Sequence, residues 1–107
     1  IALDLGLESV ISNSEKYGSS TISIQVREDE DDIYISVVDD GDGMNQQALE
    51  RYGTPFNTAS SKEGGSGLGV YFSLQLIKDA GWDWAVESEL KLGTTVHIII
   101  PKKTIVL

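Results

Sequence analysis

Two pairs of β-branched segments, each pair joined by a short turn, constrain most strongly what this chain can fold into. The paired segments are 22–26 with 33–38 and 82–87 with 94–100. The turns at 28–32 and 90–93 are too short for a crossover, and strands joined by such turns pair antiparallel. The sequence therefore predicts two β-hairpins. Pro101 ends the second one, because proline cannot donate to a ladder hydrogen bond.

Apolar side chains at three- and four-residue steps predict helices before and between the hairpins. The helical segments are 3–17, 46–52 and 67–80. Gly18 and Gly81 are stop signals for the two long helices, and Asn45 is a suitable cap for the short one. Each long helix has one apolar stripe, so we expect an α+β fold. It should be a two-layer sandwich with helices on one face of a mainly antiparallel mixed sheet. The other face should be polar, or covered by a partner.

The composition argues against several classes of function. With 107 residues, 40% of them hydrophobic, the chain suits a single domain, 1–107. A formal net charge of −9 argues against binding to nucleic acid or to an anionic membrane. The lack of cysteine excludes thiol chemistry, and a single histidine argues against a Ser-His-Asp triad. No apolar run approaches the roughly 20 residues of a membrane span. The chain starts at Ile1 within a helical pattern, which indicates a fragment of a longer protein.

Residues 13–17, at the end of the first predicted helix, combine three kinds of ligand-binding group. Asn13, Lys16 and Tyr17 share one helix face, because residues three and four apart are neighbours there. An amide oxygen suits a hard metal ion, an ammonium suits a phosphate, and an aromatic ring can flank a base. Taken alone, the segment is more typical of an ordinary helix end, where Lys16 complements the helix dipole.

A cluster of aspartates and glycines follows the first hairpin at residues 39–43. Its glycines allow the backbone to approach a ligand closely, and a carboxylate at the end of a strand can accept from an exocyclic amine. A plain Asp/Gly turn and a calcium loop are the alternatives. The twelve-residue calcium spacing from Asp39 reaches Glu50, but Gly41 and Gly43 occupy the third and fifth ligand positions.

A glycine-rich segment, Gly-Gly-Ser-Gly-Leu-Gly at 64–69, runs directly into a predicted helix. The N–H groups at a helix N-terminus form an anion site, and glycines let such donors wrap a phosphate chain. The segment is not a Walker loop, since no Gly-Lys-Ser/Thr follows, and not a Rossmann fingerprint, since a loop precedes it. A flexible linker is the alternative.

The order of these segments resembles the GHKL ATPase superfamily, which includes DNA gyrase and histidine kinases. It is most similar to the catalytic ATP-binding domain of a sensor histidine kinase. The matching segments are the N box at 13–17, the first glycine box at 39–43, the F-box region at 53–56 and the second glycine box at 65–69. Gly93-Thr94 then precedes the last strand, and the resemblance runs from about Leu7 to Pro101. It implies the Bergerat form of the two-layer sandwich.

The resemblance implies how a nucleotide base would be recognised. Asp39 would accept from the adenine 6-amino group, and Thr94 would complete the hydrogen-bond network around the adenine. Gly41 and Gly43 would shape the base pocket, and Tyr17 would lie against the nucleotide.

The resemblance also implies how the phosphates would be held. Asn13 would coordinate a Mg²⁺ ion that bridges the triphosphate, and Lys16 would meet a phosphate oxygen, which makes these two the expected catalytic residues. Main-chain donors would come from the second glycine box, at Gly65, Gly67, Leu68 and Gly69. Residues 53–64 would form the ATP lid, with Lys62 as an additional phosphate cation.

ATP and Mg²⁺ are thus the expected cofactors. The resemblance implies transfer of the γ-phosphoryl group to a histidine on a separate dimerisation domain. A response regulator is a further expected partner. His97 lies on a predicted strand and is given no role, so we expect this chain alone not to phosphorylate itself. We expect it to be monomeric and to be the cytoplasmic portion of a kinase.

Two departures from the superfamily pattern matter. Ser9 stands where the water-activating members have a glutamate, four residues before Asn13, which argues against ATP hydrolysis by a general base. Ser14 replaces the usual alanine, a small change that we expect to be silent. An anti-sigma-type serine kinase with the same fold and a non-catalytic nucleotide-sensing module remain as alternatives.

Overall fold

The computed structural model describes residues 2–16, 20–54 and 68–105. The elements are α1 (Ala2–Lys16), β1 (Ile22–Glu28), β2 (Asp32–Asp39), α2 (Gln46–Arg51), α3 (Leu68–Asp79), β3 (Asp83–Glu89), β4 (Gly93–Pro101) and the 3-10 turn η1 (Lys102–Thr104). Every helix and strand expected from the sequence is present, and their ends agree within two residues.

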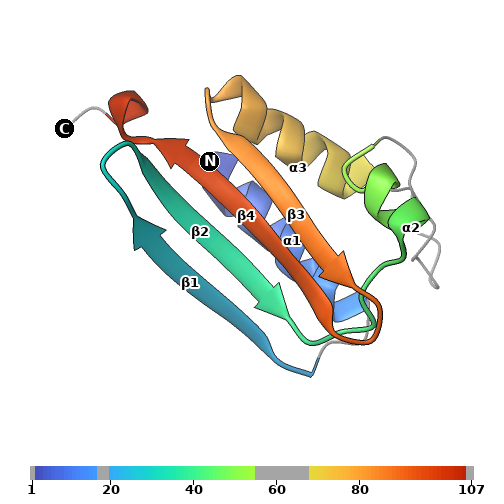
Figure 1. The fold of residues 1–107 in the computed structure, drawn as a ribbon. Coiled ribbons are helices and arrows are strands. Elements are labelled where there is room, and N and C mark those ends of the chain that lie inside the picture. Colours follow the sequence, from blue (N-terminus) through green and yellow to red (C-terminus); the bar gives the residue numbers. More distant parts are fainter. Residues whose placement is uncertain (1, 17–19, 55–67, 106–107) are drawn as a thin grey trace.

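The four strands form one sheet in the order β1-β2-β4-β3. Each neighbouring pair is antiparallel, so both predicted hairpins are confirmed, and β2 and β4 join them in the middle of the sheet. Figure 1 shows α1 and α3 together behind the sheet, with α2 beside one end of it. The two-layer α+β arrangement is therefore confirmed.

The core lies between the sheet and the two long helices. Alternate residues of the central strands point into it, as in Val37 of β2 and Val96 and Ile98 of β4, all at most 2% exposed. Helix α1 contributes Val10, which is 1% exposed, and α3 contributes Leu74, also 1% exposed. No helix within the described ranges is long and apolar enough to cross a membrane.

The two long helices run antiparallel and pack closely. A Cβ added at Gly6 of α1 would lie 2.6 Å from Cδ1 of Ile77 on α3, so glycine permits this approach. One turn further along α1, the hydroxyls of Ser9 and Ser73 form a hydrogen bond of 2.6 Å. Ser9 therefore holds α1 against α3.

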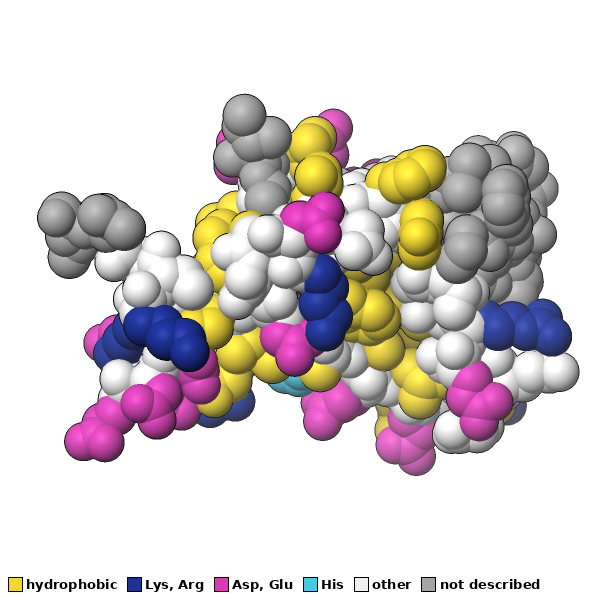
Figure 2. Space-filling model, turned by 90° about the horizontal axis from the view of Figure 1, so that it is seen from above, with side chains coloured by type: hydrophobic (Ala, Val, Ile, Leu, Met, Phe, Trp, Pro, Cys, Tyr) yellow, Lys and Arg dark blue, Asp and Glu magenta, His cyan; other side chains and the backbone are white. Residues whose placement is uncertain are grey.

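Edge strand β1 is less covered than its neighbours. Ile24 and Val26 lie on the same sheet face as the buried Val37 and Ile35 of β2, since these are their register partners, yet they are 52% and 69% exposed. Among the strands, α1 packs mainly on β2, and β1 lies at the edge of the sheet, where the helical layer covers it less. Figure 2 shows further apolar side chains on the surface seen from above, set between acidic and basic ones.

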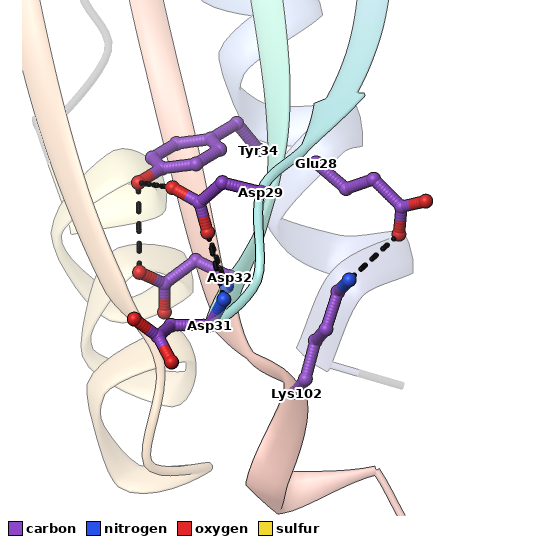
Figure 3. Close-up of polar contacts among 6 residues, drawn as sticks. All are labelled: Glu28, Asp29, Asp31, Asp32, Tyr34 and Lys102. Carbon is purple, nitrogen blue, oxygen red and sulfur yellow. Dashed lines mark hydrogen bonds and ion pairs between the residues drawn. The ribbon is translucent and has the colours of Figure 1, made fainter.

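The β1–β2 turn lies at one end of the sheet, with Asp39 at the other end of β2. In this turn, Oδ1 of Asp29 accepts from the backbone N–H groups of Asp31 and Asp32, and the Tyr34 hydroxyl donates to Oδ2 (Figure 3). These bonds, above all that from the Asp32 N–H, lower the pKa of Asp29. The acidic run is thus a turn closed by its own side chains.

Candidate functional site

Four of the predicted site residues, Asp39, Gly41, Gly43 and Thr94, lie at the end of the sheet where β2 finishes and β4 starts. Asp39, the last residue of β2, is the register partner of Thr94, and Thr94 is in turn the partner of Ser88 on β3. Because cross-strand partners share a face, all three side chains lie on the helix-covered side. Asp39 and Thr94 are both 7% exposed.

The two carboxylate oxygens of Asp39 have different surroundings. Oδ1 accepts the backbone N–H of Gly41 at 2.9 Å and that of Thr94 at 3.1 Å. Within the described part of the chain, Oδ2 receives no hydrogen bond. The fold therefore fixes the carboxylate through one oxygen, while the other has no hydrogen-bond partner among the described residues.

The next residue, Asp40, has a structural role on the opposite side of the strand end. Its Oδ1 accepts the N–H groups of Ser20 and Thr21, both at 2.9 Å, and its Oδ2 accepts from the Ser20 hydroxyl. The Thr21 bond is the largest cause that lowers the pKa of Asp40. These bonds place the chain that follows α1 beside the end of β2.

Two glycines let the loop after β2 approach the β3–β4 hairpin. Gly43 has φ +71°, and a Cβ there would lie 2.0 Å from the carbonyl oxygen of Glu89. Gly93 has φ +118°, and its Cβ would lie 2.0 Å from the carbonyl oxygen of Asp39. Any other residue would push these backbones apart. The expected role of Gly43 in shaping a base pocket stays a prediction. Gly41 is buried, and its N–H is one of the two that hold Oδ1 of Asp39.

Ser88 is a site residue that the sequence reading missed. Its Oγ accepts the N–H of Met44 at 2.8 Å, donates to the carbonyl of Gly93 at 3.0 Å and contacts Oγ1 of Thr94 at 2.8 Å. It thereby ties the loop after β2 to the start of β4. The alternation of β3 gave a signal, because Trp84 and Val86 are inward positions, and a serine two residues further also points inward.

Asn13 lies in the last turn of α1, and Figure 1 shows this end of α1 near the end of β2. The side chain of Asn13 is partly exposed, and its amide makes no hydrogen bond with any described residue. The neighbouring Ser14 is buried, at 4% exposure. An open amide oxygen at this end of the molecule fits a hard cation such as Mg²⁺, which takes few protein ligands and keeps several waters or phosphate oxygens.

The second glycine box is described only at its end. Gly69 lies in the first turn of α3 and is exposed, with open space where a Cβ would stand. Lys16 and Leu68 lie in helices, but their side chains are outside the description. Four further predicted site residues, Tyr17, Lys62, Gly65 and Gly67, lie outside the described residues, as does most of the predicted lid. Gly53, the first residue of the predicted lid, lies so close to Trp84 that an added Cβ would be 2.8 Å from its indole.

The calcium alternative finds no support in the described geometry. In residues 2–16, 20–54 and 68–105, no three His, Cys, Asp or Glu side chains gather as a metal site. Asp39 faces the helical layer while Asp40 binds Ser20 and Thr21, and the Glu50 carboxylate contacts Gln46 within α2. The acidic loop therefore does not fold as a chelating ring.

Comparison with known proteins places this chain in a family. Residues 1–104 match the family described as "Histidine kinase-, DNA gyrase B-, and HSP90-like ATPase". The chain belongs to this family, which confirms the superfamily resemblance and implies ATP as the nucleotide.

Its relatives include proteins named as sporulation kinases and as sensor histidine kinases. The chain is 42% identical over 73 residues to Sporulation kinase E and 37% identical over 106 residues to the sensor histidine kinase WalK, both of Bacillus subtilis (strain 168). These matches cover 68% and 91% of the chain but only 10% and 17% of the two relatives. The mycobacterial sensor histidine kinase MprB has the same fold, with a TM-score of 0.79 over 94% of this chain and 72% of that one, at 24% identity.

Proposed function

We propose that residues 1–107 form the ATP-binding catalytic domain of a two-component sensor histidine kinase. The observation that carries the proposal is the difference between the surroundings of the two Asp39 carboxylate oxygens. Its Oδ1 is held by the N–H groups of Gly41 and Thr94, and its Oδ2 remains available to a ligand. A buried acceptor fixed in this way suits the exocyclic amino group of adenine, because a buried polar group gains most from a partner when its position is already set.

The phosphates would be bound by residues of α1 and of the second glycine box. Asn13 would hold Mg²⁺ through its amide oxygen, and the ion supplies the positive charge that an acidic chain needs to accept a triphosphate. Lys16, one turn further along α1, would meet a phosphate oxygen. Main-chain N–H groups of the second glycine box, including Leu68 and Gly69 at the start of α3, would meet the same phosphates.

The chemistry would be transfer of the γ-phosphoryl group to a histidine nitrogen on a dimerisation domain. The bond from the γ-phosphorus to the bridging oxygen breaks, a phosphorus–nitrogen bond forms, and ADP leaves. Catalysis of this kind relies on positioning and charge stabilisation rather than on a protein base. Ser9, engaged with Ser73, agrees with this, since it offers no carboxylate to activate water. The acceptor domain, a response regulator and a cytoplasmic location belong to the same proposal.

Titration calorimetry with ATP tests the binding step. We expect the chain to bind ATP in excess Mg²⁺ and to bind it more weakly in EDTA. In the Asn13→Ala variant the difference between the two conditions should shrink, while Ser12→Ala, one residue away on the exposed side of α1, should behave as the parent chain. A folded chain that binds no ATP under either condition would defeat the proposal.

A transfer assay tests the reaction. The chain is mixed with labelled Mg-ATP and a separately produced histidine-bearing dimerisation domain. Transfer to histidine gives an acid-labile phosphoryl group, whereas transfer to a serine, as in an anti-sigma-type kinase, gives an acid-stable one. Binding of ATP without transfer to a histidine or a serine would favour a nucleotide-sensing module instead.

A further inference from the structure

The hydroxyl groups of Ser88 and Thr94 form a small closed network next to Asp39. Ser88 Oγ has three neighbours, the Met44 N–H at 2.8 Å, the Gly93 carbonyl at 3.0 Å and Thr94 Oγ1 at 2.8 Å. Ser88 and Thr94 are cross-strand partners, as are Thr94 and Asp39. The network therefore reaches directly to the carboxylate proposed to read the base.

Counting donors fixes the direction of the bond between the two hydroxyls. A hydroxyl has one proton to donate and two lone pairs that accept. The Gly93 carbonyl can only accept, so the Ser88 proton goes to it. The Met44 N–H can only donate, so it occupies one lone pair of Ser88 Oγ. All three contacts are hydrogen bonds only if Thr94 donates its proton to the remaining lone pair of Ser88.

Thr94 Oγ1 then has no proton left for a ligand and can only accept. Asp39 Oδ2, on the neighbouring strand and on the same face, is an acceptor as well. Two acceptors on cross-strand partners that share a face match an amino group, which carries two protons. They disfavour a keto oxygen, since a buried acceptor that faces another acceptor loses its solvation without gaining a bond.

We propose that Ser88 is a positioning residue that sets the base specificity of this domain, by holding the Thr94 hydroxyl as an acceptor and so favouring 6-amino over 6-keto purines. This inference rests on the proposed function. It adds a residue on β3 that does not itself touch the nucleotide and acts through Thr94.

The test compares the dissociation constants of ATP and inosine triphosphate, which carries a keto oxygen at the same position. The parent chain should prefer ATP. In Ser88→Ala the Thr94 hydroxyl is released and can turn its proton toward a keto oxygen, so the preference for ATP should fall by about tenfold, the equivalent of one hydrogen bond. Ser88→Thr keeps the hydroxyl and should retain the parent ratio. Loss of loop structure alone would weaken the binding of both nucleotides equally and leave the ratio of their dissociation constants unchanged.

Two controls separate the outcomes. Ser36→Ala removes another buried serine hydroxyl, bound to His97 on the open sheet face, and should leave the ratio unchanged. In a Thr94→Val background, Ser88→Ala should no longer change the ratio, because there is no hydroxyl to position. If the parent chain binds ATP but Ser88→Ala keeps its full preference, the role of Ser88 is overturned while the proposed function stands. If the parent chain binds neither nucleotide, both are overturned.

Discussion

The side chain of Asp39 serves the fold with one oxygen and is proposed to serve the ligand with the other. Asp39→Asn keeps an acceptor for the N–H groups of Gly41 and Thr94, but replaces Oδ2 with a donor that faces the adenine amino group. We expect ATP affinity to fall roughly 10- to 100-fold, the range for a lost hydrogen bond to a charged group. Calorimetry with ATP measures this loss, and thermal unfolding shows whether the fold is kept.

The matched control is Gln25→Ala, on the exposed face of edge strand β1. It removes a polar side chain of similar size away from the end of β2, so ATP affinity should stay within twofold of the parent chain, about 0.4 kcal/mol. Equal losses in the two variants would contradict the assignment of Asp39.

Gly93 is required by backbone geometry rather than by chemistry. At φ +118°, with a would-be Cβ 2.0 Å from the carbonyl oxygen of Asp39, Gly93→Ala combines conformational strain with a backbone clash. We expect a loss of about 3 kcal/mol or more in the free energy of unfolding, because such φ values are strained for other residues and the backbone must also move. Urea unfolding measures this value.

Gly81 supplies the comparison for Gly93. Its φ is also positive, at +86°, but the nearest atom to a Cβ is a methyl group of Thr104 at 3.7 Å. Gly81→Ala therefore pays only the conformational cost, about 1–2 kcal/mol. Similar losses at both positions would mean that the clash with Asp39 is relieved cheaply.

At the scale of the elements, the close approach of α1 and α3 depends on Gly6. Gly6→Ala gains about 1 kcal/mol of helix propensity but drives a methyl group against Ile77, which is fully buried. Overpacking costs about 1–3 kcal/mol, so we expect a net destabilisation measurable by urea unfolding. Ile77→Val removes the atom that Gly6→Ala would touch.

The double variant tests this contact. Because Ile77→Val makes room for the added methyl group, the two changes together should cost at least about 0.5 kcal/mol less than the sum of the single changes. Additive costs would show that α1 shifts as a whole instead of pressing on Ile77.

Local sequence patterns predicted the helices and strands well, because each of these elements depends mainly on the residues within it. Alternation located the strands, and the glycines after the helices located their ends. The exposure of Ile24 and Val26 could not be predicted, since their alternation is that of a buried face and only the placement of α1 over β2 leaves them uncovered. Asp39 was found through its motif, whereas Ser88 acquires its place only when β3 pairs with β4.

For the molecule as a whole, the excess of acidic residues shapes the pH dependence of stability. Asp29 and Asp40 each accept two backbone N–H groups, and these bonds lower the pKa of both below the ordinary value of 3.8. They tie turns at opposite ends of the sheet, Asp29 between β1 and β2 and Asp40 beside the end of β2. A carboxyl whose pKa is lower in the folded state stabilises the fold above its unfolded pKa, and this stabilisation is lost as the pH falls through the folded pKa.

We therefore expect the urea midpoint of the parent chain to hold near neutral pH and to decline below about pH 4, the unfolded pKa of aspartate. Asp29→Asn and Asp40→Asn should each lower the midpoint at pH 7 and make the decline between pH 4 and 2 shallower, since neither variant has that proton to take up. Glu30→Gln, whose side chain makes no hydrogen bond with any described residue, should leave the slope unchanged. Unfolding curves at pH 7, 4 and 3 decide the matter, and a decline equally steep in all four proteins would assign the acid sensitivity to other carboxylates.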